Sequence, residues 1–358
     1  MAKDKIRIYT ATRFFTSFAF GTILPVYVLY FRHYQINLFQ IALLAAIFEA
    51  SILFFEMPTG LLADIYGRRI SVVLSSLVSL ISGLIFIFFP FLAGFVVAGV
   101  IGGLGETLRS GALEAWLVDS LKHEGKEEKL KYAFARGTKF KTAGNLSGLI
   151  LGGYLASVNM KLVWVPFTIA FFILCLLLIR KMKEEYAIEK KVSERIIFKF
   201  SETIRQSLNV LKAQKLILAL ILLSLFSEFS FETISQFWQV HFDENLFIPT
   251  QYFGWILAIA SILTILFIDK VTTLSERFIH EISSLIILEF LFLVSLLLVA
   301  LTVSPLLAVM FFILLQTFVS FKEPIFLNLY TFKLIDVKRE VKIERRQILR
   351  KWNELSFL

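Results

Sequence analysis

Apolar residues fill this chain in long blocks, and short charged stretches separate one block from the next. A helix needs about 20 apolar residues to cross the hydrocarbon core of a bilayer, and each block reaches roughly that length. The pattern predicts an all-α integral membrane protein with ten spans. We expect these spans at residues 8–31, 38–58, 70–90, 92–118, 137–158, 162–180, 216–240, 251–269, 282–302 and 305–330.

The charged stretch 181–215 interrupts this pattern after the sixth span and indicates a domain boundary. Residues 1–180 are expected to form a six-helix bundle, and 216–330 a second bundle of four spans. Between them, 181–215 is predicted to be a cytoplasmic linker. Residues 331–358 carry many lysines and arginines and no apolar block, so we expect a charged cytoplasmic tail.

Composition agrees with a membrane protein: 57% of the 358 residues are hydrophobic and 39 are phenylalanine. The net charge of +9 does not indicate nucleic-acid binding, because the basic residues lie between apolar blocks rather than on one face. Cys175 is the only cysteine, which excludes an internal disulfide. The four histidines lack the spacing of metal ligands, and no phosphate-binding Gly-x-x-x-x-Gly-Lys-Ser/Thr loop is present. We therefore expect no enzyme activity, no cofactor and no metal.

Lysine and arginine concentrate in alternate loops, which predicts the orientation of the chain. Lys3, Arg7, Arg68 and Arg69 fall in one set of loops, whereas the opposite set holds little beyond Arg32 and Lys161. By the positive-inside rule, both termini and the linker are cytoplasmic in a multi-pass protein of the plasma membrane. The first apolar block is too long for the core of a secretory signal, so we expect it to be retained as a span.

One polar turn stands between the second and third blocks, with the sequence Gly-Leu-Leu-Ala-Asp-Ile-Tyr-Gly-Arg-Arg over 60–69. Gly60 and Gly67 permit a reversal, Asp64 can pair with Arg68 or cap the next helix, and the arginines hold the turn in the cytoplasm. The turn is therefore predicted to be a tight hairpin between two membrane helices.

This turn resembles the signature loop between the second and third helices of the major facilitator superfamily of transporters. The resemblance implies a two-bundle helical fold of twelve spans that works by alternating access. It also implies that Asp64, Arg68 and Asp119 form a charge cluster that stabilises the outward-facing state. Because only ten spans are predicted, we expect a chain truncated or frameshifted after the tenth span, with a reduced relative as the alternative. The gating residues implied are Gly60, Asp64, Gly67, Arg68, Arg69 and Asp119.

Charged groups inside spans are costly unless they are paired or face water, so they are candidates for function. Glu49, Glu106 and Glu228 lie near the expected midplane, where a carboxyl can carry a proton. The alternative is local pairing, because Glu106 and Arg109 are three residues apart on one helix. A polar side of span seven is the expected substrate-facing surface, with helix–helix hydrogen bonding as its alternative. The predicted proton and substrate cavity comprises Glu49, Glu106, Arg109, Glu228, Glu232 and Gln236.

Span five contains glycines at positions 144, 148, 152 and 153, a spacing that lets helices approach closely. We expect Gly144, Gly148, Gly152 and Gly153 to serve helix packing. The pattern is similar to a span-five motif of proton-coupled efflux members of the superfamily, except that Leu149 replaces a proline.

These features together predict a secondary transporter of small molecules, with proton-coupled efflux as the first hypothesis. Uptake of a metabolite or sugar by symport is the alternative, and a non-transporting remnant or an interaction subunit is a third possibility from a different class. The expected partners are a small-molecule substrate, protons or sodium, and the lipid bilayer. We expect a monomer that binds no nucleic acid.

Overall fold

The computed structural model describes residues 2–184, 236–277 and 281–322, with scattered positions between 222 and 234 and at 324–325. These residues form helices joined by short turns, and no strand occurs among them. The chain divides into two compact units. Unit 1 comprises residues 1–194 and 235–258, and unit 2 comprises 195–234 and 259–358. The predicted boundary in the linker stays a prediction, and the structure groups 235–258 with the first bundle.

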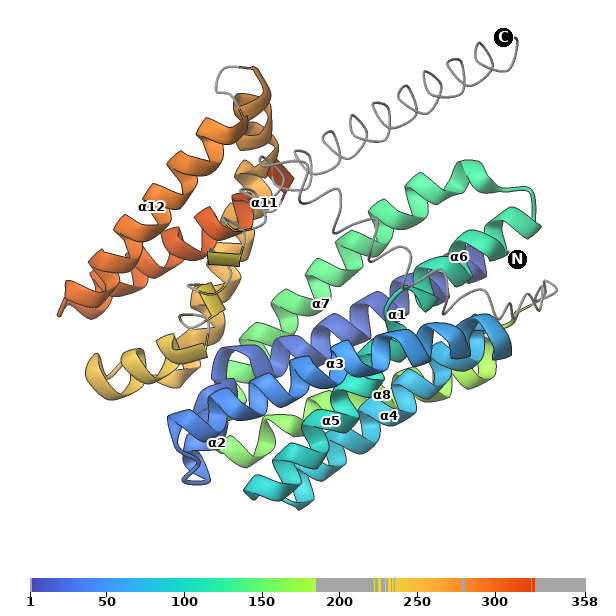
Figure 1. The fold of residues 1–358 in the computed structure, drawn as a ribbon, viewed down its shortest axis with the longest axis horizontal. Helices are drawn as coiled ribbons and strands as arrows, with labels where there is room; N and C mark the ends of the chain where they lie inside the picture. Colours follow the sequence, from blue (N-terminus) through green and yellow to red (C-terminus); the bar gives the residue numbers. More distant parts are fainter. Residues whose placement is uncertain are drawn as a thin grey trace, which may run out of the picture. The chain divides into compact units, whose positions relative to one another are not determined.

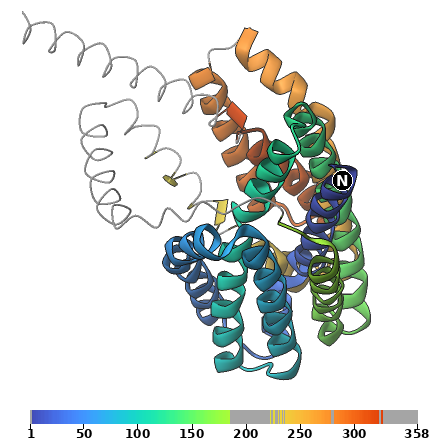
Figure 2. The same ribbon diagram turned by 90° about the vertical axis from the view of Figure 1, so that its right-hand side faces the viewer.

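The helices of unit 1 form one bundle (Figure 1), and Figure 2 shows the same bundle turned by 90°. Short helical turns η1 (Leu24–Val26), η2 (Glu127–Lys129) and η3 (Met160–Leu162) connect the longer helices. The part of unit 1 that follows the linker contains η4 (His241–Asn245), η5 (Thr250–Tyr252) and the start of α11. The main helices are α1 (Ala2–Ile23), α2 (Tyr27–His33), α3 (Leu38–Tyr66), α4 (Arg68–Phe88), α5 (Leu92–Arg109), α6 (Ala112–His123), α7 (Leu130–Val158) and α8 (Trp164–Lys181).

Within the described ranges, eight helical stretches are long and apolar enough to span a membrane. They correspond to eight of the ten expected spans. The expected fifth span lies inside α7, a 29-residue helix. Because of its glycines and polar residues, α7 is not apolar enough to be one of these eight stretches. The expected seventh span, 216–240, lies largely outside the described residues. The all-α membrane fold is confirmed.

Two expected spans are broken helices. The first span divides at Pro25 in η1, because proline has no N–H to continue the helix. The fourth span divides between α5 and α6, where Gly111 has a φ of +74°. Each break has a signal in the sequence, Pro25 in the first span and the pair Ser110–Gly111 in the fourth. The prediction of spans from the length of the apolar blocks did not consider these residues.

The helices α1 and α7 pack with their backbones almost in contact, and the α7 glycines make this possible. A Cβ at Gly144, Gly148 or Gly152 would lie 2.3, 2.4 or 2.0 Å from a carbonyl oxygen of α1. A Cβ at Gly153 would instead meet Gln251 and Gly254 from η5 and α11, 3.1 Å away. The structure therefore places all four glycines at helix–helix contacts.

Serines line the face of α4 that packs in the bundle. The hydroxyl of Ser71 donates to the Leu108 carbonyl at 2.7 Å, and that of Ser82 donates to the Ala98 carbonyl at 2.8 Å. Small polar residues of this kind let membrane helices approach and satisfy their own hydrogen bonds. At the other end of α4, Phe86 stacks on Trp164 with ring centroids 3.7 Å apart, which closes the bundle with α8.

Unit 2 contains the rest of α11 (Phe253–Arg277), α12 (Glu281–Leu301) and a helix over Pro305–Lys322. In Figure 1, α12 and the helix that follows it are drawn in orange and red. Leu285 and Leu288 of α12 pack with Phe321 and Ile325 in a small apolar cluster. Many other apolar side chains of α12, such as Phe290 and Leu297, are exposed, as expected of helices that face lipid.

Candidate functional site

The turn between α3 and α4 depends on one glycine rather than two. Gly67 has a φ of +104°, so it ends α3 and begins α4 in a conformation that side chains rarely adopt. Gly60 lies about two turns earlier inside α3, and a Cβ there would meet nothing within 4 Å. The expectation that Gly60 takes part in the reversal is wrong, because the helix continues through it.

Beyond this turn, Arg68 forms an ion pair with Asp119 of α6, the pair that the family resemblance implied. The backbone N–H groups of Arg68 and Arg69 donate to the two carboxylate oxygens of Glu184, at 3.1 and 3.2 Å. Glu184 therefore caps α4, where an anion is favoured by the helix dipole. Asp64 is exposed and neither pairs with Arg68 nor caps α4 among the described residues.

Glu184 is a residue that the sequence analysis missed. It follows α8 directly, after the basic end of that helix, and only the fold brings it to α4, 115 positions away in sequence. The signal in the sequence was the acidic pair Glu184–Glu185, which directly follows the basic end of an apolar block.

Three acids on α6 or directly after it each pair with a base from another helix. Glu114 lies 3.2 Å from Arg13 of α1, and the side chain of Glu124 lies 2.9 Å from Lys5 of α1. Glu114, Asp119 and Glu124 form what we call the α6 acid row. The Arg13 side chain is therefore paired near the predicted cytoplasmic end of the bundle rather than extended toward the membrane surface.

The Glu124 carboxyl is the one member of the row that lies beyond the membrane-spanning helix. Burial alone would raise its pKa, but hydrogen bonds and charge interactions with Lys5 and Lys126 outweigh burial and lower the pKa below its ordinary value. The carboxylate is thus held charged by two lysines, and this links α1 to the end of α6.

The pair Glu106–Arg109 lies at the break in the fourth span. Both Nη2 hydrogen bonds of Arg109 go to the Glu106 carboxylate, within the last turn of α5. The side chains are 29% and 15% exposed for Glu106 and Arg109, so the pair is neither sealed in the core nor fully open. Ser110 and Gly111 follow at once and separate α5 from α6. A charged pair next to a broken membrane helix is typical of a transport site.

The other predicted cavity residues lie on different elements. Glu49 is exposed on α3, Glu232 is exposed in unit 2, and Gln236 is half-buried in unit 1. Glu228 lies outside the described residues. The structure brings together Glu106 and Arg109, and a cavity shared with the other four residues stays a prediction.

Gln239 lies on the predicted polar side of span seven. Its side chain bonds to the backbone groups that the break in the first span leaves without their helical partners. Its side-chain oxygen accepts a hydrogen bond from the N–H of Val28, and its NH2 group donates to the carbonyl of Leu24, both at 2.9 Å. In an unbroken helix, Val28 and Leu24 would bond to each other. Nearby, Arg32 and Glu244 form an ion pair of 2.9 Å. For Gln239, the helix–helix alternative is the one observed.

Unit 2 holds the charged pair Glu289–Lys322. Lys322 was not among the residues predicted from the sequence. The Lys322 amine lies 2.8 Å from a carboxylate oxygen of Glu289, and it also lies 4.6 Å from the centre of the Phe292 ring. The side chains of Lys322 and Glu289 are only 5% and 20% exposed. An amine buried to this degree at the end of an apolar helix needs such partners.

No group of three or more potential metal ligands occurs within the residues that the structure describes. Eight helical stretches of membrane-spanning length among the described residues define a polytopic membrane protein. The family model described as Major Facilitator Superfamily matches residues 10–334, and this chain belongs to that family.

Relatives of known sequence or structure agree with this assignment. The chain is 27% identical over 263 residues to the uncharacterized MFS-type transporter YxaM of Bacillus subtilis (strain 168), covering 73% of this chain and 63% of that protein. The chain thus spans less than two thirds of that relative's length. It shares the fold of the nucleoside transporter NupG (TM-score 0.73, 13% identity, 90% of this chain and 80% of that one). A D-xylose-proton symporter has a TM-score of 0.62 at 13% identity, covering 89% of this chain and 79% of that one.

Proposed function

We propose that the chain exports small amphipathic or apolar molecules in exchange for protons, by alternating access between two helical halves. The observation that supports this proposal most directly is the Glu106–Arg109 pair at the break between α5 and α6. A proton that reaches Glu106 neutralises the carboxylate and leaves Arg109 without its counter-charge. Because the break lets the two parts of the span move separately, loss of the pair is coupled to a change in helix geometry.

Two further contacts fit the proposal as gates. Gln239 and Glu244 hold the part of unit 1 that follows the linker against the broken first span. At the predicted cytoplasmic end, Arg68–Asp119 and the Glu184 cap fix the start of α4. Alternating access requires contacts at the two ends that form and break in turn, and polar contacts separate at lower cost than packed apolar ones. We assign Asp64, Gly67, Arg68, Arg69 and Asp119 to the cytoplasmic gate.

Proton-coupled uptake of a nucleoside or a sugar is the second candidate. It is favoured by two proteins of the same fold, a nucleoside transporter and a D-xylose-proton symporter. At 13% identity that likeness concerns the fold, so substrate and direction must be decided by measurement.

Flux in proteoliposomes distinguishes the candidates. The purified chain is reconstituted with a pH-sensitive dye inside, and the probes are ethidium, uridine and D-xylose. Exchange predicts that an acidic interior drives ethidium inward as protons leave, whereas symport predicts that an acidic exterior drives uridine or D-xylose inward. Absence of flux for every probe and gradient would contradict both and favour a non-transporting protein.

Two matched variants test the role of Glu106. Glu106→Gln is expected to abolish proton-driven accumulation while probe exchange without a gradient continues, because the neutral amide cannot carry a proton. Glu128→Gln removes the same charge from the exposed turn η2, outside the spans, and should leave flux unchanged. Proton-driven flux that survives in Glu106→Gln would remove this residue as the carrier.

A further inference from the structure

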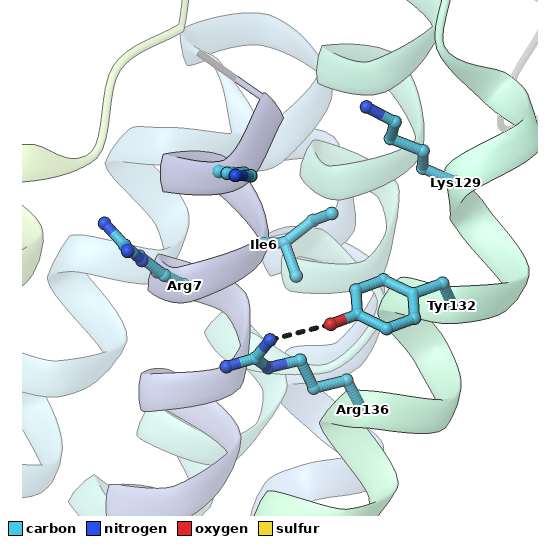
Figure 3. A pocket seen from close by; sticks show the side chains of 6 residues that line it. Ile6, Arg7, Lys129, Tyr132 and Arg136 are labelled. Atoms are coloured by element: carbon cyan, nitrogen blue, oxygen red, sulfur yellow. Dashed lines mark hydrogen bonds between the residues drawn. The ribbon is translucent and has the colours of Figure 1, made fainter.

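A pocket of about 510 Å³ opens between the first turns of α1 and the start of α7. Its lining is unusual in charge: four of the six lining residues are cations and none is an acid. Figure 3 shows Ile6 and Arg7 on α1 and Lys129, Tyr132 and Arg136 on the facing segment. None of the residues predicted to form the substrate cavity lines it. The pocket is formed by Lys3, Ile6, Arg7, Lys129, Tyr132 and Arg136.

The positive charge of this pocket is not balanced within the described part of the chain. Lys3, Lys129 and Arg136 form no ion pair there, and Arg7 lies 3.6 Å from Asp4 in a pair whose side chains are more than 60% exposed. Such a pair contributes little, because water screens it. Lys5 in the same turn of α1 makes the contrast clear, since it is buried against Glu124. The pocket therefore presents a net positive charge that a bound anion would complement.

Arg136 is held in place without a carboxylate. Its Nη1 donates to the Tyr132 hydroxyl at 2.7 Å, as the dashed line in Figure 3 shows, and its guanidinium lies 5.5 Å from the centre of the Phe140 ring. A guanidinium held by a hydroxyl and an aromatic ring, with no carboxylate partner among the described residues, is suited to bind a phosphate oxygen.

We propose that this pocket binds the phosphate headgroup of an anionic membrane lipid. A lipid fits better than a soluble phosphate because Ile6 and Tyr132 give the pocket an apolar part, and because α1 starts its passage through the membrane here. A tyrosine beside lysines and arginines at the end of a span is typical of the headgroup region. The proposal does not depend on the substrate or on the direction of transport.

Lipid retention by the purified full-length chain tests this proposal. The protein is placed in nanodiscs of phosphatidylcholine with increasing phosphatidylglycerol, and bound lipid is measured by native mass spectrometry after release from the disc. We expect phosphatidylglycerol to be retained in preference to phosphatidylcholine. Equal retention of the two lipids would overturn the proposal. Displacement of phosphatidylglycerol by millimolar inorganic phosphate would instead identify a soluble anion as the ligand and overturn the lipid assignment.

Paired variants locate the binding site. Lys129→Gln with Arg136→Gln should weaken phosphatidylglycerol binding roughly 30-fold, at about fivefold for each cation lost. Lys139→Gln with Lys141→Gln removes the same charge from exposed positions of the same helix outside the pocket and should have little effect. Lys3→Gln with Arg7→Gln changes the α1 side of the pocket without touching the Arg136–Tyr132 contact, so a similar loss there excludes misfolding of α7 as the cause. Equal losses in the pocket and control pairs would contradict a specific site.

Discussion

The two units of this chain hold their helices together in different ways. In unit 1, α1 and α7 meet backbone to backbone through glycines, and polar side chains join the helices at both ends. In the described part of unit 2, α12 and the helix that follows meet through apolar side chains and the Glu289–Lys322 pair. Unit 1 should therefore be most sensitive to added volume, and unit 2 to a removed charge.

The ion pairs of the two units also differ in their access to water. Arg68 and Asp119 of unit 1 are 28% and 34% exposed, whereas Lys322 of unit 2 is only 5% exposed. Water weakens a partly exposed pair and reduces the cost of breaking it to about 1 kcal/mol or less. A buried amine without its carboxylate costs several times more.

The largest effect is expected from Gly152→Leu in unit 1. Its Cβ would lie 2.0 Å from the Thr22 carbonyl oxygen, so the backbones of α1 and α7 must move apart. We expect a loss of more than about 4 kcal/mol, which would leave little folded protein. Size-exclusion chromatography in detergent, with a fluorescent tag, measures the folded fraction.

Gly60→Ala is the matched control for this substitution. A Cβ at Gly60 meets nothing within 4 Å inside α3, and alanine favours the helix by roughly 0.5–1 kcal/mol. The folded yield of Gly60→Ala should equal or exceed that of the wild type. A yield for Gly152→Leu close to the control would mean that α1 and α7 do not pack as described.

The next largest effect is expected from Lys322→Met in unit 2. This change leaves Glu289 in an apolar region without the amine, at a cost of about 3–5 kcal/mol. The double variant Lys322→Met with Glu289→Leu removes both charges and should recover most of that stability. Thermal unfolding of the purified variants measures both, and a double variant as unstable as the single one would show that packing, rather than charge, is the main contribution.

Arg68→Met sharpens the same comparison in unit 1. Because its pair with Asp119 is partly exposed, the stability loss should be about 1 kcal/mol or less, well below that of Lys322→Met. Equal losses in the two variants would remove the contrast between the units.

A third prediction concerns the Gln239 contact with the broken first span. Gln239→Leu leaves the Val28 N–H and the Leu24 carbonyl without partners, at a cost of about 1–3 kcal/mol. Hydrogen–deuterium exchange of the peptide that contains Val28 should accelerate. Gln239→Glu keeps the acceptor for Val28 but, as a carboxylate, cannot donate to Leu24, so its exchange rate should fall between those of the wild type and Gln239→Leu.

These contacts show which parts of the structure could be predicted from the sequence. Block length was sufficient to predict the membrane helices, because the thickness of the bilayer determines the number of apolar residues needed. The Glu106–Arg109 pair was also predictable as an alternative, since residues three apart share a helix face. The Arg68–Asp119 pair followed from the resemblance of the turn to a known family motif.

Contacts between distant segments could not be predicted in this way. The Glu184 cap on α4 and the Gln239 contact with Leu24 and Val28 join residues more than 100 positions apart, and no local pattern encodes them. The anion pocket was missed for a different reason. Its lysines and arginines were interpreted as signals of orientation, and the positive-inside rule does not tell which cations will face one pocket.

The smallest effect is expected from pH at Glu124, outside the spans of unit 1. Lys5 and Lys126 hold the pKa of this carboxyl below its ordinary value, so the unfolded chain takes up a proton at a higher pH than the folded chain does. Its contribution to stability is therefore complete above that ordinary value and is lost as the pH falls through the folded pKa. Glu124→Gln cannot titrate, and the difference in unfolding temperature between it and the wild type should shrink as the pH falls from 7 to below 4.5, the ordinary pKa of this carboxyl. A difference that stays constant over this range would show that the lysines do not stabilise the charged form.

Since Glu289→Gln in unit 2 leaves the Glu124 contacts intact, its stability should retain the Glu124 contribution to the pH dependence.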